Sequence, residues 1–332
     1  MVADMELVIL IVIFGLVFDY TNGFHDAANV VATVIATRVL LPISAIVLAG
    51  VLNFIGATQI SGVAQTIATG IVDPESATQL VVLCAVLGAI AWNLVTWYYG
   101  IPSSSSYALI GGIVGSAWVH KDMSVILWHG VIGKVILPMI FSPLIGFGIG
   151  FLLMKGLFFY VSHQKHNHSI FRHLQIGSAC FVALSHGLND AQKSMGLITL
   201  GLFAGGYLAE PHIPFWVILS CAIVMGLGTA SGGFRIIKTM GFSITKINPV
   251  QGFAAETSAS AVILAASFLG MPVSSTHVIT GGITGVGTAK GRHAVRWNVP
   301  RQLVFAWILT LPGAGAISAS AYLLAAYILG TA

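Results

Sequence analysis

The chain has 332 residues, of which 57% are Ala, Val, Ile, Leu, Met, Phe, Trp, Tyr or Cys and only 7% are charged. A typical soluble domain is about 25% charged, so this composition excludes a cytosolic enzyme, a disordered chain and a DNA-binding protein. A mean hydropathy of +0.94 indicates segments that are solvated by lipid or by one another. The net charge of +4 comes from basic residues in short loops between apolar stretches. This pattern is typical of membrane topology signals and not of nucleic-acid binding.

Apolar stretches follow one another along the whole chain. A hydrocarbon core about 30 Å thick requires roughly 20 apolar residues for each helical span. The leader of the first stretch carries Asp4 and Glu6 but no basic residue, unlike the start of a cleaved signal peptide. We therefore expect the mature protein to begin at Met1 with a membrane segment. The expected spans are residues 5–21, 42–68, 76–99 and 137–161, and then 173–186 continuing into 190–208, 214–231, 251–268 and 301–330.

Three further stretches, 25–37, 103–119 and 274–288, are too short or too rich in Gly and Ser for full spans. They favour half-helices or re-entrant arms. Together with the full spans, they predict an all-α polytopic membrane protein with about 10–12 helical segments. The His163–His168 run, where the two halves of the chain meet, is expected to be a solvated linker.

Two motifs each occur twice, in the same order and at nearly the same spacing. The Gly23–Ala27 segment (GFHDA) matches Gly187–Ala191 (GLNDA), 164 residues later. The Gly100–Ser106 segment (GIPSSSS) matches Gly270–Thr276 (GMPVSST), 170 residues later. Both offsets are close to half the chain length, which indicates a duplication. We take residues 1–165 as the first repeat and 166–332 as the second.

The placement of Lys and Arg predicts that the two repeats are inverted. If the N-terminus lies outside the cell, the expected cytoplasmic loops hold 11 of the 14 basic residues, as the positive-inside rule requires. In the same orientation, the 100–115 segment enters from outside and the 270–285 segment from inside. Inverted repeats recur in secondary transporters, which bind their substrate near the membrane midplane. The 11 residues are Arg38, Lys155, Lys165, Arg172, Arg235, Lys238, Lys246, Lys290, Arg292, Arg296 and Arg301.

A few ionisable residues lie inside the expected membrane region, where each costs at least about 2.5–3.5 kcal/mol. Asp26 and Asp190 occupy equivalent positions in two polar, glycine-containing stretches, 21–26 and 185–190. These stretches favour interrupted helices that line a cavity, and the pair of carboxylates can bind a cation or a proton. For Asp19 and Glu256, a structural role as buried contacts between helices stays open. The remaining ionisable residues of this region are His25, His186, Lys193 and His277.

The two Pro-Ser segments predict an anion site. Gly100 and Gly270 suit the end of one helix, and Pro102 and Pro272 suit the first turn of the next. The hydroxyl groups then lie at new helix N-termini, where free N–H groups and the helix dipole bind anions. Two such termini entering from opposite faces would surround a tetrahedral oxyanion; the alternative is that small serines only let helices pack closely. The expected donors are Ser104, Ser105, Ser106, Ser274, Ser275 and Thr276.

Lys193 lies one helical turn beyond Asp190, so the two side chains can form an ion pair, or the lysine can contact the anion directly. Asn29 is the equivalent residue in the first repeat. An intramembrane hydrolase would need one activated serine. The chain has no Gly-x-Ser-x-Gly motif and its hydroxyl groups form symmetric clusters, so we expect that it is not an enzyme.

The segments Asn22–Asn29 (NGFHDAAN), Ser185–Lys193 (SHGLNDAQK) and Gly270–His277 (GMPVSSTH) resemble the inorganic phosphate transporters of the PiT family. The resemblance spans nearly the whole chain. It implies an inverted-repeat secondary transporter of inorganic phosphate, usually a homodimer in the cell membrane, driven by a proton or sodium gradient. Many bacterial members of this family are thought to carry a neutral complex of phosphate with a divalent metal such as Mg²⁺.

The chain departs from the sodium-coupled members, which resemble Gly-Ala-Asn-Asp-Val-x-Asn in both repeats. His25 replaces the first Asn of this motif, and Gln192 and Lys193 stand where the second repeat would have a small residue and the last Asn. These changes resemble the bacterial proton-coupled type. A fixed ammonium group at Lys193 would supply the charge that a bound sodium ion otherwise brings.

Together these observations predict a phosphate importer that is coupled to a proton or another cation and has no permanently bound cofactor. The alternatives are a permease for sulfate or another oxyanion, a sodium-coupled symporter and a passive anion channel. Phosphate carries an ionisable proton that can be donated to a carboxylate, whereas sulfate does not, so the aspartates favour phosphate. Beyond the hydroxyl groups, the expected phosphate ligands are Asn189, Gln192 and Lys193; the expected proton or cation carriers are Asp26, Asp190, His25, Asn29 and Glu256; a transported metal would bind Asp26 and Asp190.

Overall fold

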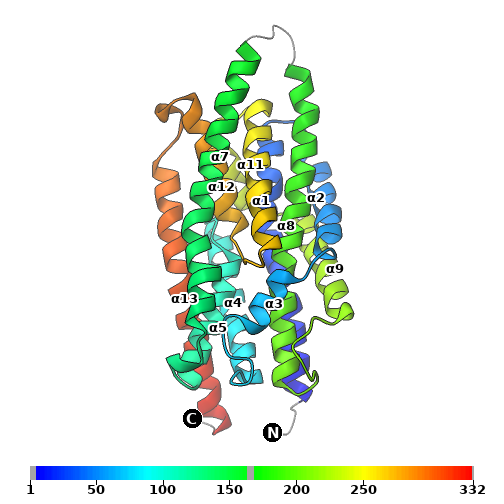
Figure 1. Ribbon diagram of the computed structural model, residues 1–332, viewed down its shortest axis with the longest axis vertical. Helices are drawn as coiled ribbons and strands as arrows, with labels where there is room; N and C mark the ends of the chain where they lie inside the picture. The colour runs from blue at the N-terminus through cyan, green and yellow to red at the C-terminus, as the bar shows by residue number, and fades with distance from the viewer. Residues whose placement is uncertain (1–4, 163–167, 331–332) are drawn as a thin grey trace.

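The two halves of the chain form corresponding series of helices, with small differences in the short elements, in the computed structural model, which describes residues 5–162 and 168–330 (Figure 1). The first half contains α1 (Met5–Ala36), α2 (Pro42–Ala57), α3 (Gly62–Thr69), α4 (Gln79–Tyr99), α5 (Ser105–His120), a 3-10 turn (Met123–Val125), α6 (Trp128–Gly130), a π-helical turn (Val131–Ile136) and α7 (Leu137–Ser162). The second half contains α8 (His168–Ala204), α9 (Phe215–Ser231), α10 (Phe234–Lys238), a π-helical turn (Thr239–Ser243), α11 (Pro249–Phe268), α12 (Ser275–Lys290), a 3-10 turn (Arg292–Ala294) and α13 (Asn298–Leu329).

Equivalent helices of the two halves run in opposite directions. In Figure 1, α1 begins at the lower end and α8 at the upper end, while α7 runs upward and α13 downward. Isolated β-bridges occupy equivalent places, one between Val72 and Ile126 and one between Thr245 and Val295. The fold is therefore a pair of inverted repeats. The expected boundary at residue 165, residues 163–167 of the expected linker and residues 1–4 lie outside the described residues. His168, the last residue of that linker, begins α8.

The two repeats interlock through their first two helices. α1 packs against α9, and α8 packs against α2. A Cβ on Gly23 of α1 would lie 2.8 Å from the Met225 carbonyl oxygen of α9, and a Cβ on the equivalent Gly187 of α8 would lie even closer to the Asn53 backbone of α2. Backbones can approach this closely only where glycine leaves room. The same contact is thus made twice, once in each direction.

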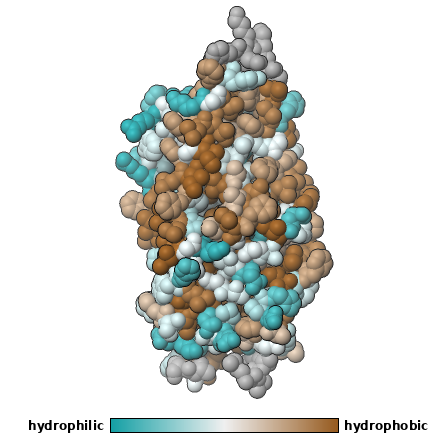
Figure 2. Space-filling model, in the orientation of Figure 1, coloured by the Kyte–Doolittle hydropathy of each residue, from teal (hydrophilic) through white to brown (hydrophobic). Residues whose placement is uncertain are grey.

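Among the described residues, four continuous helical stretches are long and apolar enough to cross a membrane: α1, α4, α13 and residues 128–160. Two helix pairs qualify when each is counted as one bent span, α2 with α3 (69°) and α9 with α10 and the turn after it (59°). Large hydrophobic side chains are exposed on the outer helices, including Leu152, Phe215 and Phe305. In Figure 2, hydrophobic residues cover much of the visible face, while hydrophilic residues gather toward its lower end and upper left edge. Such a surface suits a lipid environment, as expected for a multi-pass membrane protein.

The expected helix breaks at 21–26 and 185–190 are wrong, and so is the separate half-helix at 25–37. α1 and α8 run without interruption through these stretches. Gly23 and Gly187 serve close helix packing, so neither is a helix terminus. Most of the polar side chains find partners on other helices and do not compete with their own backbone; His25, for example, contacts Thr96 of α4. The other short stretches, 103–119 and 274–288, form α5 and α12 as separate arms.

The expected span at 42–68 is bent by 69° between α2 and α3, so it is a broken span and not one straight helix. The first turn of α3 has two backbone N–H groups, those of Val63 and Ala64, that donate to the side-chain oxygen of Gln192 on α8 at 2.8 and 3.0 Å. An exposed helix start inside a membrane would leave these donors without partners. Gln192 satisfies them and so stabilises the bend.

Candidate functional site

The N-termini of α5 and α12 meet in the interior of the protein. Each follows a left-handed glycine, Gly100 (φ 67°) or Gly270 (φ 64°), that ends the preceding helix region. The side chain of Ser104 accepts a hydrogen bond from the third backbone N–H of α5, and Ser274 does the same for α12, both at 3.3 Å. The Ser106 hydroxyl of α5 donates to the Val273 carbonyl oxygen at the start of α12, at 3.1 Å. Two positive helix ends therefore face one region.

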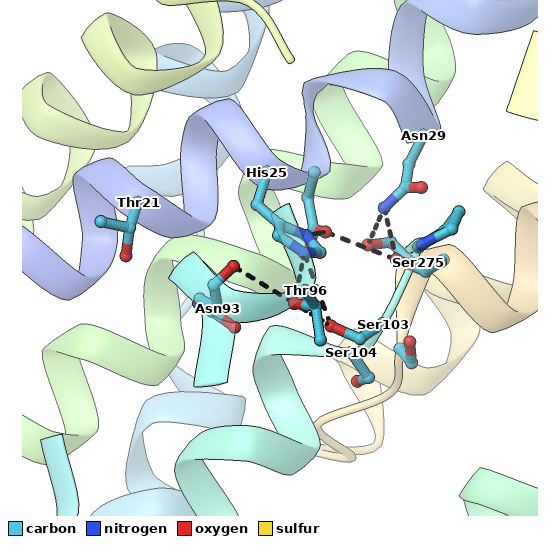
Figure 3. Close-up of polar contacts among 12 residues, drawn as sticks. Thr21, His25, Asn29, Asn93, Thr96, Ser103, Ser104 and Ser275 are labelled. Atoms are coloured by element: carbon cyan, nitrogen blue, oxygen red, sulfur yellow. Dashed lines mark hydrogen bonds and ion pairs between the residues drawn. The ribbon is translucent and has the colours of Figure 1, made fainter. Parts of the chain in front are cut away.

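The α12 arm contacts two buried aspartates. The Ser275 hydroxyl donates to Asp190 Oδ2 at 3.2 Å, and the Thr276 hydroxyl donates to Asp26 Oδ1 at 3.4 Å. Asn29 of α1 donates from Nδ2 to both hydroxyl oxygens, at 3.1 and 2.9 Å (Figure 3). The predicted hydroxyl donors and the predicted carboxylates thus lie within hydrogen-bonding distance of one another.

Asp26 and Asp190 approach each other from α1 and α8. Oxygen atoms of the two carboxylates and a ring nitrogen of His186 all lie within 4.8 Å of one another. Lys193 Nζ lies 2.8 Å from Asp190 Oδ1, and His186 Nε2 lies 3.3 Å from Asp190 Oδ2. All four side chains are almost completely buried. Buried carboxylates need nearby cations or protons, so this group of side chains is suited to hold a cation.

His25 connects Asp26 to the α5 arm. Its Nδ1 lies 2.9 Å from Asp26 Oδ1, and its Nε2 lies 3.1 Å from Thr96 Oγ1 and 3.4 Å from Ser103 Oγ (Figure 3). Ser103 also donates to Thr96 Oγ1 at 2.8 Å. A histidine with a carboxylate on one nitrogen and hydroxyl groups on the other can hold or pass on a proton. The hydroxyl of Ser105, next along this arm, is buried and has no partner within the part of the chain that the structure describes.

Three predicted residues lie apart from this group. Asn189 donates to Ser267 Oγ (2.8 Å) and the Met271 carbonyl oxygen (3.3 Å), beside the turn that leads into α12. Gln192 is held by the first turn of α3, as described above, so its side-chain oxygen is occupied. Glu256 of α11 lies in a separate polar cluster with Thr33 of α1.

Sequence reasoning assigned no role to Thr96 and named His186 only as an ionisable residue of the membrane region. Ser103 belongs to the hydroxyl groups that were expected at the start of the first Pro-Ser arm. Thr96 and Asn93 are isolated polar residues in an apolar span, which is a weak signal because a threonine often bonds to its own helix backbone. His186 lies four residues before Asp190, a helix spacing that places both side chains on one face. That spacing was a usable signal once a continuous helix was assumed.

A family model described as "Phosphate transporter family" matches the chain twice, at residues 22–169 and at residues 159–318. The chain belongs to this family. The double match supports the duplication that the repeated motifs indicated, and membership of a transporter family agrees with the prediction that the chain is not an enzyme.

Relatives of this phosphate transporter family member match it over almost its whole length. A Rhizobium meliloti (strain 1021) protein described as "Probable low-affinity inorganic phosphate transporter" is 48% identical over 312 residues, which cover 93% of each chain. A Bacillus subtilis (strain 168) protein with the same description is 46% identical and covers 95% of this chain and 96% of its own. A solved structure described as "The sodium-dependent phosphate transporter" superposes with a TM-score of 0.88 at 25% identity, covering 97% of this chain and 100% of that one.

Proposed function

We propose that this protein imports inorganic phosphate across the cell membrane and binds it between the N-termini of α5 and α12. Relatives over nearly the full length are described as phosphate transporters. The observation that carries the proposal is the meeting of these two helix starts directly beside Asp26 and Asp190. Backbone N–H groups and serine hydroxyls then donate to the anion, and a phosphate hydroxyl donates to a carboxylate.

The two carboxylates beside the hydroxyl donors favour phosphate over sulfate. Ser275, Thr276 and Asn29 present hydroxyl and amide groups to the same small region. Asp26 and Asp190 can only accept hydrogen bonds when ionised. Sulfate brings no hydrogen at neutral pH and would face both carboxylates with acceptors alone. Phosphate brings at least one O–H, so its hydrogen bonds with the aspartates can be formed.

The charges of the site require a mobile cation. Asp26 and Asp190 contribute two negative charges when ionised, and Lys193 contributes one positive charge at 2.8 Å from Asp190. An entering phosphate ion adds at least one more negative charge to a region without solvent contact. Burying an uncompensated charge costs several kcal/mol, so phosphate has to enter together with positive charge.

We propose that this mobile charge is a proton. His25 and Asp26 are in contact at 2.9 Å and form a pair that can bind a proton. Lys193 stays in place as the second cation. The alternative is a sodium-coupled symporter, in which a sodium ion takes the place of the proton in the same cycle. A passive anion channel is less suited, because conduction needs weak binding and gains nothing from buried carboxylates.

A divalent metal bound together with phosphate is a second candidate for the transported charge. Asp26, His186 and Asp190 each offer one ligand atom within the 4.8 Å cluster. Two carboxylate oxygens and an imidazole nitrogen are suitable ligands for Mn²⁺ or Zn²⁺, while Mg²⁺ prefers the oxygens and keeps several waters. A neutral metal–phosphate complex would also reduce the anionic charge that enters the site. The metal is cargo in this reading and not a resident cofactor.

Transport proceeds by alternating access, in which the α5 and α12 arms move against the outer helices. We further propose a homodimer in the cell membrane, with the N-terminus of each chain outside. The orientation follows from the basic residues at the ends of the spans.

The test is uptake of labelled phosphate into proteoliposomes under separately imposed proton and sodium gradients, with and without Mg²⁺, and with sulfate as competitor. Accumulation that follows the proton gradient and resists excess sulfate supports the proposal. Accumulation that follows only a sodium gradient contradicts proton coupling. Strong competition by sulfate contradicts phosphate selectivity, and equilibration without accumulation under any gradient identifies a channel.

A further inference from the structure

A polar stripe leads away from the aspartate pair along one face of α1. Residues three or four positions apart share a helix face, and Asp26, Asn29 and Thr33 follow this spacing along α1. Thr37 continues it one residue beyond the helix end at Ala36. Thr33 lies seven residues beyond Asp26, which is roughly 10.5 Å along the helix axis. Asp26, Asn29 and Thr33 are buried and Thr37 is partly exposed. The stripe therefore connects the aspartate pair to the part of the surface where α1 ends, in the upper half of Figure 1.

Glu256 of α11 lies against this stripe and is completely buried. Its Oε1 accepts hydrogen bonds from Thr33 Oγ1 at 2.6 Å and from Gln175 Nε2 of α8 at 2.9 Å. Its Oε2 contacts the hydroxyl of Ser178, also on α8. Gln175 Oε1 in turn accepts from Thr37 Oγ1 at 2.8 Å. A continuous set of hydrogen bonds thus runs from Glu256 to the partly exposed Thr37.

The neighbours of Glu256 do not neutralise it. No Lys, Arg or His nitrogen lies within ion-pair distance of this carboxyl in residues 5–162 and 168–330. The titratable group that interacts with it from α8 is the Cys180 thiol. The α1 residue that faces it is the neutral Thr33. A buried carboxylate without a cation is costly, and taking up a proton removes that cost.

The cluster provides hydrogen bonds for both protonation states of Glu256. In the ionised form, Thr33, Gln175 and Ser178 all donate to the carboxylate. In the protonated form, the new O–H on Oε2 donates to Ser178 Oγ, and the Ser178 hydrogen turns to the Gln175 backbone carbonyl oxygen, 3.1 Å away. Neither state leaves a buried polar atom of the cluster without a partner, which would otherwise cost about 1–3 kcal/mol. A purely structural contact needs the hydrogen bonds of only one of these states, and a glutamine at this position would provide them.

We propose that Glu256 carries the coupled proton between the Asp26–Asp190 pair and the surface where α1 ends. This inference rests on the proposed function, because it assigns the route of the proton that enters with phosphate. An O–H bond at the aspartate pair breaks when the α5 and α12 arms move and water enters the site, and the proton moves along Asn29 and Thr33 to Glu256 Oε2, where a new O–H bond forms. Glu256 then releases the proton to water beside Thr37 and becomes a carboxylate again. The aspartate pair is left ready for the next proton.

The decisive variant is Glu256→Gln, which keeps the shape and hydrogen bonds of the protonated form but cannot release a proton. Two assays with the full-length protein in proteoliposomes separate the steps. Net uptake driven by a pH gradient requires proton release in every cycle. Exchange of labelled for unlabelled phosphate at equal pH on both sides does not. We expect net uptake to fall by about 10²-fold, as on removal of a positioned proton-transfer group, while exchange persists. The matched control is Glu210→Gln in the exposed loop between α8 and α9, which should leave both rates unchanged.

Several results would overturn the assignment. Net uptake by Glu256→Gln at the wild-type rate would show that the proton takes another route. Loss of exchange together with net uptake, in a variant that elutes like the wild type in size-exclusion chromatography, would make Glu256 part of phosphate binding. A changed sodium dependence with an unchanged pH profile would make it a cation ligand. Failure of the wild-type protein to transport phosphate would instead contradict the proposed function itself.

Ser178→Ala provides a second, independent readout. This change removes the hydroxyl that donates to the ionised carboxylate and accepts from the protonated one. The hydrogen bond of Ser178 to the ionised carboxylate is stronger than the one to the protonated carboxyl, so its removal destabilises the ionised form of Glu256 more. We expect the pH profile of net uptake to shift to higher pH while exchange at equal pH persists. An unchanged profile would contradict a role for this cluster in proton transfer.

Discussion

Replacing Lys193 by asparagine tests the idea that the protein carries one of its own counter-ions. The ammonium group is completely buried and lies 2.8 Å from Asp190 Oδ1. Asparagine is the residue that the first repeat has at the equivalent position 29, so the replacement fits the repeat pattern and leaves room for water or an ion. The variant should therefore fold but should need one additional mobile cation for each phosphate.

The structure sets the expected size of this effect. Breaking a buried ion pair from one side costs about 3–5 kcal/mol, because the other charge is left uncompensated. If the missing charge has to come from solution, phosphate affinity falls by roughly two to three and a half powers of ten at unchanged pH. If the added cation is a proton, apparent affinity also gains about one further power of ten for each unit by which the pH is lowered. If it is sodium, added sodium restores binding.

The assay is the apparent KM for labelled phosphate in proteoliposomes, measured at several pH values with and without sodium. Lys121→Asn is the control. Lys121 is exposed, and its Nζ donates to Ser76 Oγ at 3.3 Å, outside the aspartate site. It should behave like the wild type. The reasoning is refuted if Lys193→Asn keeps the wild-type affinity, the wild-type pH slope and independence of sodium.

Three further substitutions test other parts of the structure. Asp26→Asn should abolish gradient-driven accumulation while the protein keeps its far-ultraviolet circular dichroism; normal accumulation would contradict its role in coupling. The Cβ of Gly187→Ala would collide with the α2 backbone, so this change should lower stability by about 1–3 kcal/mol. The Cβ of Gly177→Ala on the same helix meets nothing within 4 Å, so this control should raise stability by up to about 1 kcal/mol. Equal Tm values for the two variants would refute this packing. Gln192→Leu should cost about 1–3 kcal/mol for each α3 donor left without a partner, seen as a Tm that falls well below that of the exposed control Gln59→Leu.

Most of the architecture could be predicted because it depends on local pattern. The duplicated segments around Asp26 and Asp190, and around Ser104 and Ser274, are sufficient to identify the repeats and both arms from the sequence. The predicted ends of the spans lie close to the observed helix ends where a Gly, a Pro or a capping residue marks the end in the sequence. α12, expected at 274–288, begins at Ser275 because Ser274 caps it.

The errors arose where a residue's role depends on a distant partner. A glycine beside polar residues, such as Gly23, can end a helix or let a neighbouring backbone pack closely, and the local sequence is the same in both cases. Only the position of α9 shows that Gly23 does the second. The bend after α2 depends on Gln192, which is 129 residues from Val63 in the sequence. Glu256 likewise could be flagged as buried and ionisable, but its partners come from α1 and α8 and share no sequence motif with it.

The reciprocal glycine contacts between α1 and α9 and between α8 and α2 have a consequence for how such a chain assembles. One repeat on its own would leave the Gly23 face of α1 without its backbone partner, so it gains that partner only from a second copy inserted upside down. In an assembly of half-length chains, this contact requires two copies that are inserted in opposite orientations. Co-expressed half-chains of the present protein should accordingly complement each other, whereas either half alone should be degraded.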